Sequence, residues 1–238
     1  MCLSNEMKLT GGAQDYYERS LDILKEFGGP SVYFHTQAIA EQKSRFLSDR
    51  HVEMVYATLS AWGMHRMGDS STKTKMVEFS IFKDSIQSQR DPLSRILPYQ
   101  MHNCKLTEYA DYIESMREVF FSLKVSISNA LIVAHSKTLA HLLPDLIPPI
   151  DRQYTVRFFT QNSDNFFTQG RKYRQINLPS DRGAQFADFK KYCCGIKRMF
   201  DRCDSSIFSM DSSTFNTSYP KIMDNMIMAF VKAVPKPR

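Results

Sequence analysis

The chain has 238 residues, of which 42% are hydrophobic and 12% aromatic, and this composition excludes a disordered chain and favours a globular protein with a buried core. Lysine and arginine number 31 against 25 acidic residues, so the net charge of +6 is compatible with a nucleic-acid partner without requiring one. The longest apolar run, residues 130–134, is too short to cross a bilayer, so we expect no membrane partner.

The spacing of the cysteines and histidines gives no indication of a metal site, and we expect no cofactor. The five cysteines are odd in number and include no C-x-x-C pair, so the sequence indicates neither a disulfide framework nor a zinc site. The six histidines are scattered without ligand spacing, and the common nucleotide-binding and hydrolase motifs are absent. Reduced thiols and an N-terminus without an apolar segment lead us to expect a cytoplasmic protein.

Apolar residues recur at helical spacing in five segments of the chain. The stripes are Tyr17, Leu21, Leu24 and Phe27; Val52, Val55, Tyr56, Leu59 and Trp62; Tyr109, Tyr112, Ile113, Met116 and Phe120; Phe186, Phe189, Cys193, Ile196 and Phe200; and Met223, Met226, Ile227 and Phe230. Residues 28–30, Gly-Gly-Pro, would stop the first helix, Asp49 would cap the second, and Ser218 with Pro220 would open the last.

Signals for strands are few. Alternation in residues 124–133 and the segment 173–178 each allow one short strand, and residues 204–218, rich in Ser, Thr and Asp, are typical of a surface loop. The prediction is a mainly α fold, a multi-helix globular domain with at most a small strand element. Residues 1–238 would form a single domain, or two helical lobes divided near 90–106 and 144–150.

The segment 135–159, HSKTLAHLLPDLIPPIDRQYTVRFF, combines a helix, a proline corner and an acidic residue. Leu139, Leu142 and Leu143 recur at helical spacing and predict a buried face, while Pro144 makes continuation of the helix costly. Asp151 stands at an N-cap position for the next helix. A plain helix-helix corner would also explain this pattern.

The same segment resembles the helix-hairpin-helix DNA glycosylase superfamily, in which a lysine at the start of a helix precedes a proline-containing connector and an aspartate. That resemblance implies an all-α, two-lobed fold. It also implies that Lys137 is a nucleophile that attacks the sugar C1′ of a flipped-out nucleotide, and that Asp151 is the supporting carboxylate. The family's glycine-rich hairpin is missing, because LIVAHS precedes Lys137. The segment also resembles one in prokaryotic proteins without an assigned function, which implies no mechanism.

Basic residues with an aromatic neighbour form a candidate nucleic-acid surface in the C-terminal third of the chain. Lysine and arginine side chains can neutralise phosphates, and a tyrosine such as Tyr173 can stack on a base. The candidates are Arg171, Lys172, Arg174, Lys191 and Arg198. A solvated polar helix face is the alternative explanation.

Trp62, the only tryptophan, is followed directly by Gly63. It would either fill the core at a helix end or form the wall of a pocket, with Arg66 binding an anion. Two hypotheses for function follow: a DNA-binding or DNA-processing protein related to the glycosylases, with Lys137 and Asp151 as its catalytic site, or a non-enzymatic helical binding protein without a catalytic centre.

Overall fold

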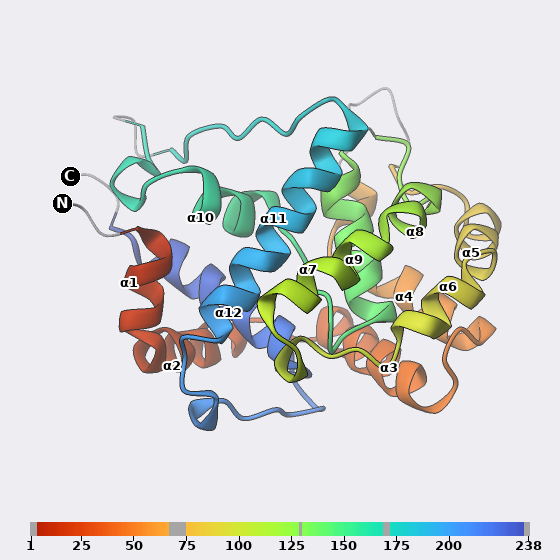
Figure 1. Cartoon of the computed structure of the whole chain (residues 1–238), viewed down its shortest axis with the longest axis horizontal. Helices are drawn as coiled ribbons and strands as arrows, with labels where there is room; N and C mark the ends of the chain where they lie inside the picture. The colour runs from red at the N-terminus through yellow and green to blue at the C-terminus, as the bar shows by residue number, and fades with distance from the viewer. Residues whose placement is uncertain (1–3, 67–74, 129, 169–171, 236–238) are drawn as a thin grey trace.

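The computed structural model describes residues 4–66, 75–128, 130–168 and 172–235, and in these ranges the chain folds into a globular assembly of α-helices (Figure 1). Their β structure is limited to two isolated bridges, Met76 with Ser126 and Phe167 with Tyr173. The predicted mainly α fold is therefore confirmed. No helix in the described ranges has both the length and the apolar character that crossing a bilayer demands.

The first half of the chain supplies eight of the α-helices. They are α1 (Asn5–Gly11), α2 (Ala13–Leu24), α3 (Pro30–Ser44), α4 (Asp49–Ala61), α5 (Phe79–Gln87), α6 (Arg90–Ile96), α7 (Leu106–Ser115) and α8 (Arg117–Ser122). Short 3-10 turns, η1 (Met64–Arg66) and η2 (Met101–Asn103), lie between them.

The second half of the chain carries the remaining helices and turns of the described ranges. They are α9 (Leu131–Leu142), the π turn η3 (Arg152–Val156), α10 (Arg157–Thr160), α11 (Arg182–Phe200) and α12 (Tyr219–Ala233), with 3-10 turns η4 (Ser163–Asn165) and η5 (Ser205–Ile207). Because α12 packs against α1 and α2, the first and last helices of the chain lie side by side (Figure 1).

Helix α9 forms the centre of the fold. Every residue from Ile132 to Leu142 is buried, and the helix contacts α3, α4 and α11 (Figure 1). A helix enclosed on all sides must satisfy its polar groups internally. Ser136 accepts the Ile150 N–H, and the Thr138 hydroxyl donates to the Ala134 carbonyl. The polar side chains of this helix are therefore structural constraints on its neighbours.

Three of the five stripes correspond to single helices, as predicted. They are α4, α11 and α12, whose apolar stripes lie mainly in the core. Ser218 caps α12 by accepting the Lys221 N–H, and Pro220 occupies its first turn. The cap of α4 differs from the prediction, because Ser48 accepts the His51 N–H and Asp49 is the first helical residue.

The other two stripes are interrupted. Helix α2 ends at Leu24 before the predicted stop, leaving Phe27 41% exposed, and Pro30 opens α3, which no stripe had marked. The third stripe divides at Met116, which leaves helical geometry between α7 and α8.

The predicted strand in residues 124–133 is wrong beyond its first residues. Ser126 forms one bridge with Met76, but α9 begins at Leu131. Because α9 is buried on all sides, its apolar residues do not follow a helical period. The alternation of apolar residues in 124–133 therefore suggested a strand. The segment 173–178 contributes only the bridge at Tyr173. The predicted surface loop ends early, since Phe215, Asn216, Thr217 and Ser218 are buried.

We expect Leu142→Ala to lower the free energy of unfolding by about 2–5 kcal/mol, because the fully buried side chain leaves a cavity in the centre of the core. Leu21→Ala on α2 is the control: this leucine is 37% exposed, and its truncation should cost much less. Urea denaturation monitored by circular dichroism measures both. Equal losses in the two variants would show that α9 is misplaced.

Candidate functional site

Lys137 lies in the middle of α9, with a side chain that is 11% exposed. The expected position at the start of a helix is therefore wrong, because residues 131–136 already belong to α9. Those residues form regular helix, where the resemblance implies a glycine-rich hairpin. Any contact with a DNA backbone must then come from other parts of the molecule.

Asp151 follows the proline corner and faces Lys137. One carboxylate oxygen accepts a hydrogen bond from the Lys137 ammonium at 3.0 Å, and the other accepts the Gln153 N–H at 2.7 Å. The predicted N-cap role of Asp151 is confirmed, although the turn it caps is a π turn closed by the Val156 N–H and the Asp151 carbonyl. Such turns are frequent at functional sites.

The ion pair sets the charge state of the carboxyl group. Burial alone would raise the pKa of Asp151, but the Lys137 ammonium and the backbone N–H groups of Gln153 and Tyr154 hold the pKa below its ordinary value. Asp151 is therefore a carboxylate at neutral pH. It supplies negative charge directly beside the Lys137 amine.

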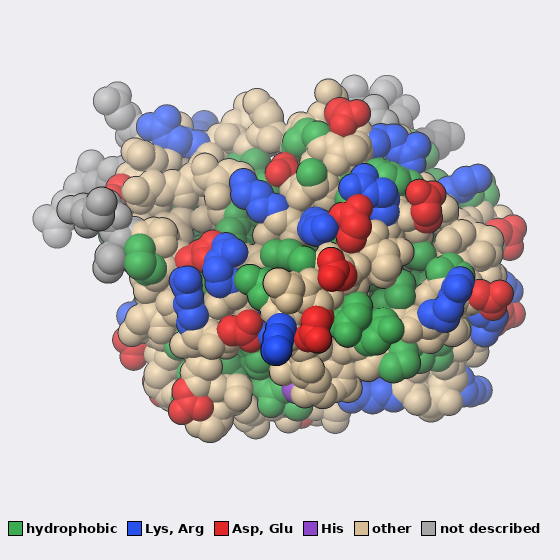
Figure 2. Space-filling model, in the orientation of Figure 1, with side chains coloured by type: hydrophobic (Ala, Val, Ile, Leu, Met, Phe, Trp, Pro, Cys, Tyr) green, Lys and Arg blue, Asp and Glu red, His purple; other side chains and the backbone are tan. Residues whose placement is uncertain are grey.

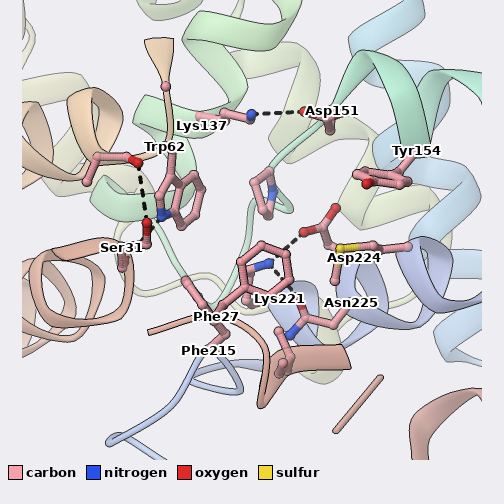
Figure 3. A pocket seen from close by; sticks show the side chains of 15 residues that line it. Phe27, Ser31, Trp62, Lys137, Asp151, Tyr154, Phe215, Lys221, Asp224 and Asn225 are labelled. Atoms are coloured by element: carbon pink, nitrogen blue, oxygen red, sulfur yellow. Dashed lines mark hydrogen bonds and ion pairs between the residues drawn. The ribbon is translucent and has the colours of Figure 1, made fainter. Parts of the chain in front are cut away.

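The pair lies on the wall of a pocket of about 430 Å³, a size within the ~300–1,000 Å³ range of small-molecule sites. The aromatic lining residues are Phe27, Trp62, Tyr154 and Phe215, and the other uncharged ones are Leu24, Ser31, Ala61, Gly63, Pro149, Asn225 and Met228. Figure 3 shows Trp62 and Tyr154 on opposite sides of the pocket. Trp62 thus ends α4 and also forms a pocket wall.

A second ion pair enters the pocket from α12. The Lys221 ammonium donates to Asp224 at 2.7 Å and to the Asn225 side-chain oxygen, and the side chains of Lys221 and Asp224 are only 12% and 14% exposed (Figure 3). The Asn225 amide in turn donates to the Asn216 side chain at 2.8 Å.

Thr155 connects the backbone of Asp151 to the carboxylate of Asp224. Its hydroxyl oxygen accepts the Asp151 N–H at 3.1 Å, and its O–H donates to Asp224 at 3.4 Å. The residue is completely buried in the π turn. Thr155 therefore relates the position of the second ion pair to that of the first.

Three buried histidines stand behind the Trp62 wall. His35 contacts His141 at 3.0 Å and the Thr217 hydroxyl at 3.1 Å, while His51 contacts the His141 carbonyl at 3.2 Å. The ring centroids of His35 and His141 lie 5.5 and 5.0 Å from that of Trp62. These imidazoles join α3, α4 and α9 beneath the pocket.

Hydrogen-bond chemistry fixes their tautomers. His141 Nδ1 must donate to the Lys137 carbonyl at 2.7 Å, which leaves its Nε2 to accept from His35 Nδ1. His35 Nε2 then accepts from the Thr217 hydroxyl. His51 Nδ1 accepts the N–H of Leu47, a residue held at a φ of 54°, and its Nε2 donates to the His141 carbonyl. All three imidazoles are neutral in this arrangement.

The described members of the predicted nucleic-acid set belong to two segments of the chain. Arg171 lies outside the described residues, whereas Lys172 and Arg174 are exposed on the segment that follows it. Arg174 shares a polar hollow with Arg152, the residue next to Asp151.

Lys191 and Arg198 belong to α11, from which no described residue lines the pocket. Lys191 is exposed, but Arg198 donates to Glu6 at 2.9 and 2.7 Å, and Lys190 pairs with Glu114. Figure 2 shows basic and acidic side chains interspersed over this face. Binding of nucleic acid by these residues stays a prediction.

Sequence reasoning missed the half of the pocket that α12 and its preceding loop provide. A signal was present, because Lys221, Asp224 and Asn225 are spaced to share one face of an otherwise apolar helix. Phe215 carried no such signal, since it lies in a stretch with the composition of a surface loop.

Comparison with known proteins found no match: no family model, no curated protein and no solved structure is significantly similar to the chain. Within the described ranges, no group of three or more His, Cys, Asp and Glu side chains is arranged to hold a metal ion. The described cysteines, Cys104, Cys193, Cys194 and Cys203, are free thiols.

The buried histidines predict a loss of stability in mild acid. Burial lowers the pKa of His51 and His141 to about 4, and that of His35 well below its ordinary value. In the unfolded chain these groups bind protons near pH 6.5, so the free energy of unfolding should fall from pH 6.5 towards 4, by up to about 1.4 kcal/mol per pH unit for each histidine.

Urea denaturation at pH 7, 6 and 5 measures this effect above the range where carboxylates titrate. His102→Gln is the control, because His102 is exposed and its replacement should leave the pH profile unchanged. A wild-type stability that is constant between pH 7 and 5 would contradict neutral, buried imidazoles.

Proposed function

We propose that the chain is a DNA-processing enzyme whose pocket receives a nucleotide turned out of the duplex, with Lys137 as the nucleophile and Asp151 as its supporting carboxylate. The observation that carries this proposal is the ion pair of these residues, 3.0 Å apart on the wall of an aromatic-lined pocket. A flipped nucleotide is bound by stacking against such walls and by hydrogen bonds to its edge. A corner that served packing alone would require no adjoining pocket.

In the proposed reaction the neutral Lys137 amine attacks the sugar C1′ as the bond from C1′ to the base breaks. The bonding electron pair leaves with the base, which then takes up a proton. Lys137 must lose its ammonium proton to solvent before attack, and Asp151, which stays ionised, supplies the negative charge that stabilises the cationic character that develops at the sugar. Loss of a proton from the new C–N bond and opening of the sugar ring give an imine that borohydride can reduce.

Phosphate contacts are proposed outside the pocket, where Arg152 and Arg174 line the neighbouring hollow together with Tyr173. Both arginines are exposed and can approach a backbone that enters from solvent. Arginine is well suited to phosphate because its planar guanidinium donates two parallel hydrogen bonds. This arrangement would separate the charged backbone from the reacting nucleotide.

We expect wild-type protein to form a borohydride-trapped covalent adduct with a duplex that contains an abasic site, because the exposed aldehyde needs only the Lys137 amine. Lys137→Gln should abolish the adduct. Asp151→Asn keeps a side-chain oxygen for the cap but loses the charge that stabilises the sugar cation. It should therefore slow release of a base from an intact nucleotide by about 100-fold or more, as measured by chromatography of the released base. Denaturing gel electrophoresis measures the adduct.

Lys43→Gln is the matched control, because it removes an exposed lysine that neither lines the pocket nor belongs to the candidate nucleic-acid surface, and it should leave the adduct unchanged. Circular dichroism verifies that each variant is folded. If Lys137→Gln protein forms as much adduct as wild type, another amine reacts and the corner is architectural, as in a non-enzymatic binding protein.

The proposed phosphate contacts predict a salt-dependent affinity for duplex DNA. Lys172→Gln and Arg174→Gln should each reduce the slope of log affinity against log salt by about 0.9 if the residue contacts one phosphate. Arg198→Gln should change the slope less, because Glu6 already engages this guanidinium. Fluorescence anisotropy between about 50 and 200 mM salt tests this, and binding that is independent of salt would contradict the proposed contacts.

A further inference from the structure

Lys221 and Asp224 face the pocket as a fixed pair of hydrogen-bonding groups. Ser218 and Pro220 begin α12 just before them, and the two side chains lie one helical turn apart with 2.7 Å between their charged atoms. In Figure 3 they occupy a different side of the pocket from Lys137 and Asp151. Lys221 and Asp224 can therefore bind one end of a ligand whose other end lies at Lys137 and Asp151.

The surrounding hydrogen bonds define what this pair can still offer. Asn225 is bonded at both ends of its side-chain amide, since its oxygen accepts from Lys221 and one of its two N–H groups donates to Asn216. Among the described residues, the Lys221 ammonium donates to two oxygens and so retains a third N–H. Asp224 accepts from Lys221 and, at 3.4 Å, from Thr155, and its carboxylate has lone pairs to spare. The pocket thus presents one strong donor beside one strong acceptor.

The charge balance of the pocket disfavours an anionic ligand. Its described lining contains two lysines and two aspartates, and no further charged side chain. The Lys221 ammonium lies 5.6 Å from the centroid of the Trp62 ring and 5.5 Å from that of Phe215. A flat neutral ring that contacts these aromatic walls would bring its edge to Lys221 and Asp224.

We propose that Lys221 and Asp224 recognise a planar heterocycle that carries a cyclic amide, with its carbonyl oxygen at Lys221 and the adjacent ring N–H at Asp224. Identification of this ring as the base of a nucleotide rests on the proposed function. In that reaction the base departs with the electron pair of the broken bond, and a cyclic amide places the resulting negative charge on its carbonyl oxygen. The Lys221 hydrogen bond then strengthens as the bond breaks, which favours release of this class of base.

Recognition can be measured without any reaction, because Trp62 is the only tryptophan and lines the pocket. We expect 1-methyluracil to change the tryptophan fluorescence, and 1,3-dimethyluracil, whose ring N–H is blocked, to bind about 10-fold more weakly or worse. Asp224→Asn should remove most of this difference, since the amide still accepts from Lys221 but offers a weaker acceptor to the ring. Asp211→Asn, in an exposed loop, is the control.

Chemistry is tested in a second arm with duplexes that contain uracil, hypoxanthine or an abasic site. Lys221→Gln should lower single-turnover release of uracil or hypoxanthine by about 10-fold or more, while adduct formation at the abasic site, which has no base to recognise, stays within about 2-fold. A merely structural Lys221 would reduce both alike.

The two arms separate the two proposals. Equal binding of 1-methyluracil and 1,3-dimethyluracil, or no binding of either at about 10 mM, overturns the proposal that Lys221 and Asp224 recognise a cyclic amide. This holds even if the abasic adduct forms through Lys137. Selective binding of 1-methyluracil without any abasic adduct supports recognition by Lys221 and Asp224 and contradicts the proposed role of Lys137 as a nucleophile.

Discussion

The fold depends on neutralising one buried lysine. Lys137 belongs to the helix that every side of the molecule encloses, and an unpaired ammonium at that place would be strongly destabilising. Asp151 provides the counter-charge 3.0 Å away, although it lies 14 positions further along the chain, beyond the proline corner. The proline corner must therefore place Asp151 beside Lys137, at one position along α9. Pro149 and the π turn after Asp151 accomplish this, and they line the pocket while doing so.

The elements that could be predicted from the sequence are those with one apolar face. Helices α4, α11 and α12 each pack one side against the core, so a period of 3.6 residues is visible in their sequences. Helix α9 has no such period because it is buried on all sides, and its first residues resembled a strand. For the site, the resemblance identified Lys137 and Asp151, and the structure places them in contact. Lys221, Asp224 and Phe215 were missed, because only tertiary folding brings residues that lie 64 to 87 positions beyond Asp151 and Lys137 to the same pocket.

The histidine network connects the pocket wall at Trp62 to the central helix α9. His141 donates to the carbonyl of Lys137 itself, accepts from His35, and packs its ring against Trp62. Each hydrogen bond has one permitted direction when all three imidazoles are neutral, so the network has a single arrangement. Trp62 is consequently held at a fixed position relative to the Lys137 backbone. In the proposed reaction, a rigid wall of this kind would keep a stacked ring at a constant distance from the amine, as attack at a single carbon requires.

Charge is distributed differently inside the pocket and on the surface beside it, and the two regions suit different parts of a ligand. Inside, each lysine is matched by an aspartate, and Thr155 links the Asp151 backbone N–H to the Asp224 carboxylate. Such a site gains little from a phosphate, whose charge would meet two carboxylates, but it can orient a neutral ring through local dipoles. Outside, Arg152 and Arg174 have no carboxylate partner among the described ion pairs and face solvent. A ligand that suits both regions carries its negative charge on a backbone and a neutral heterocycle on a branch, and a nucleotide within a polymer has that form.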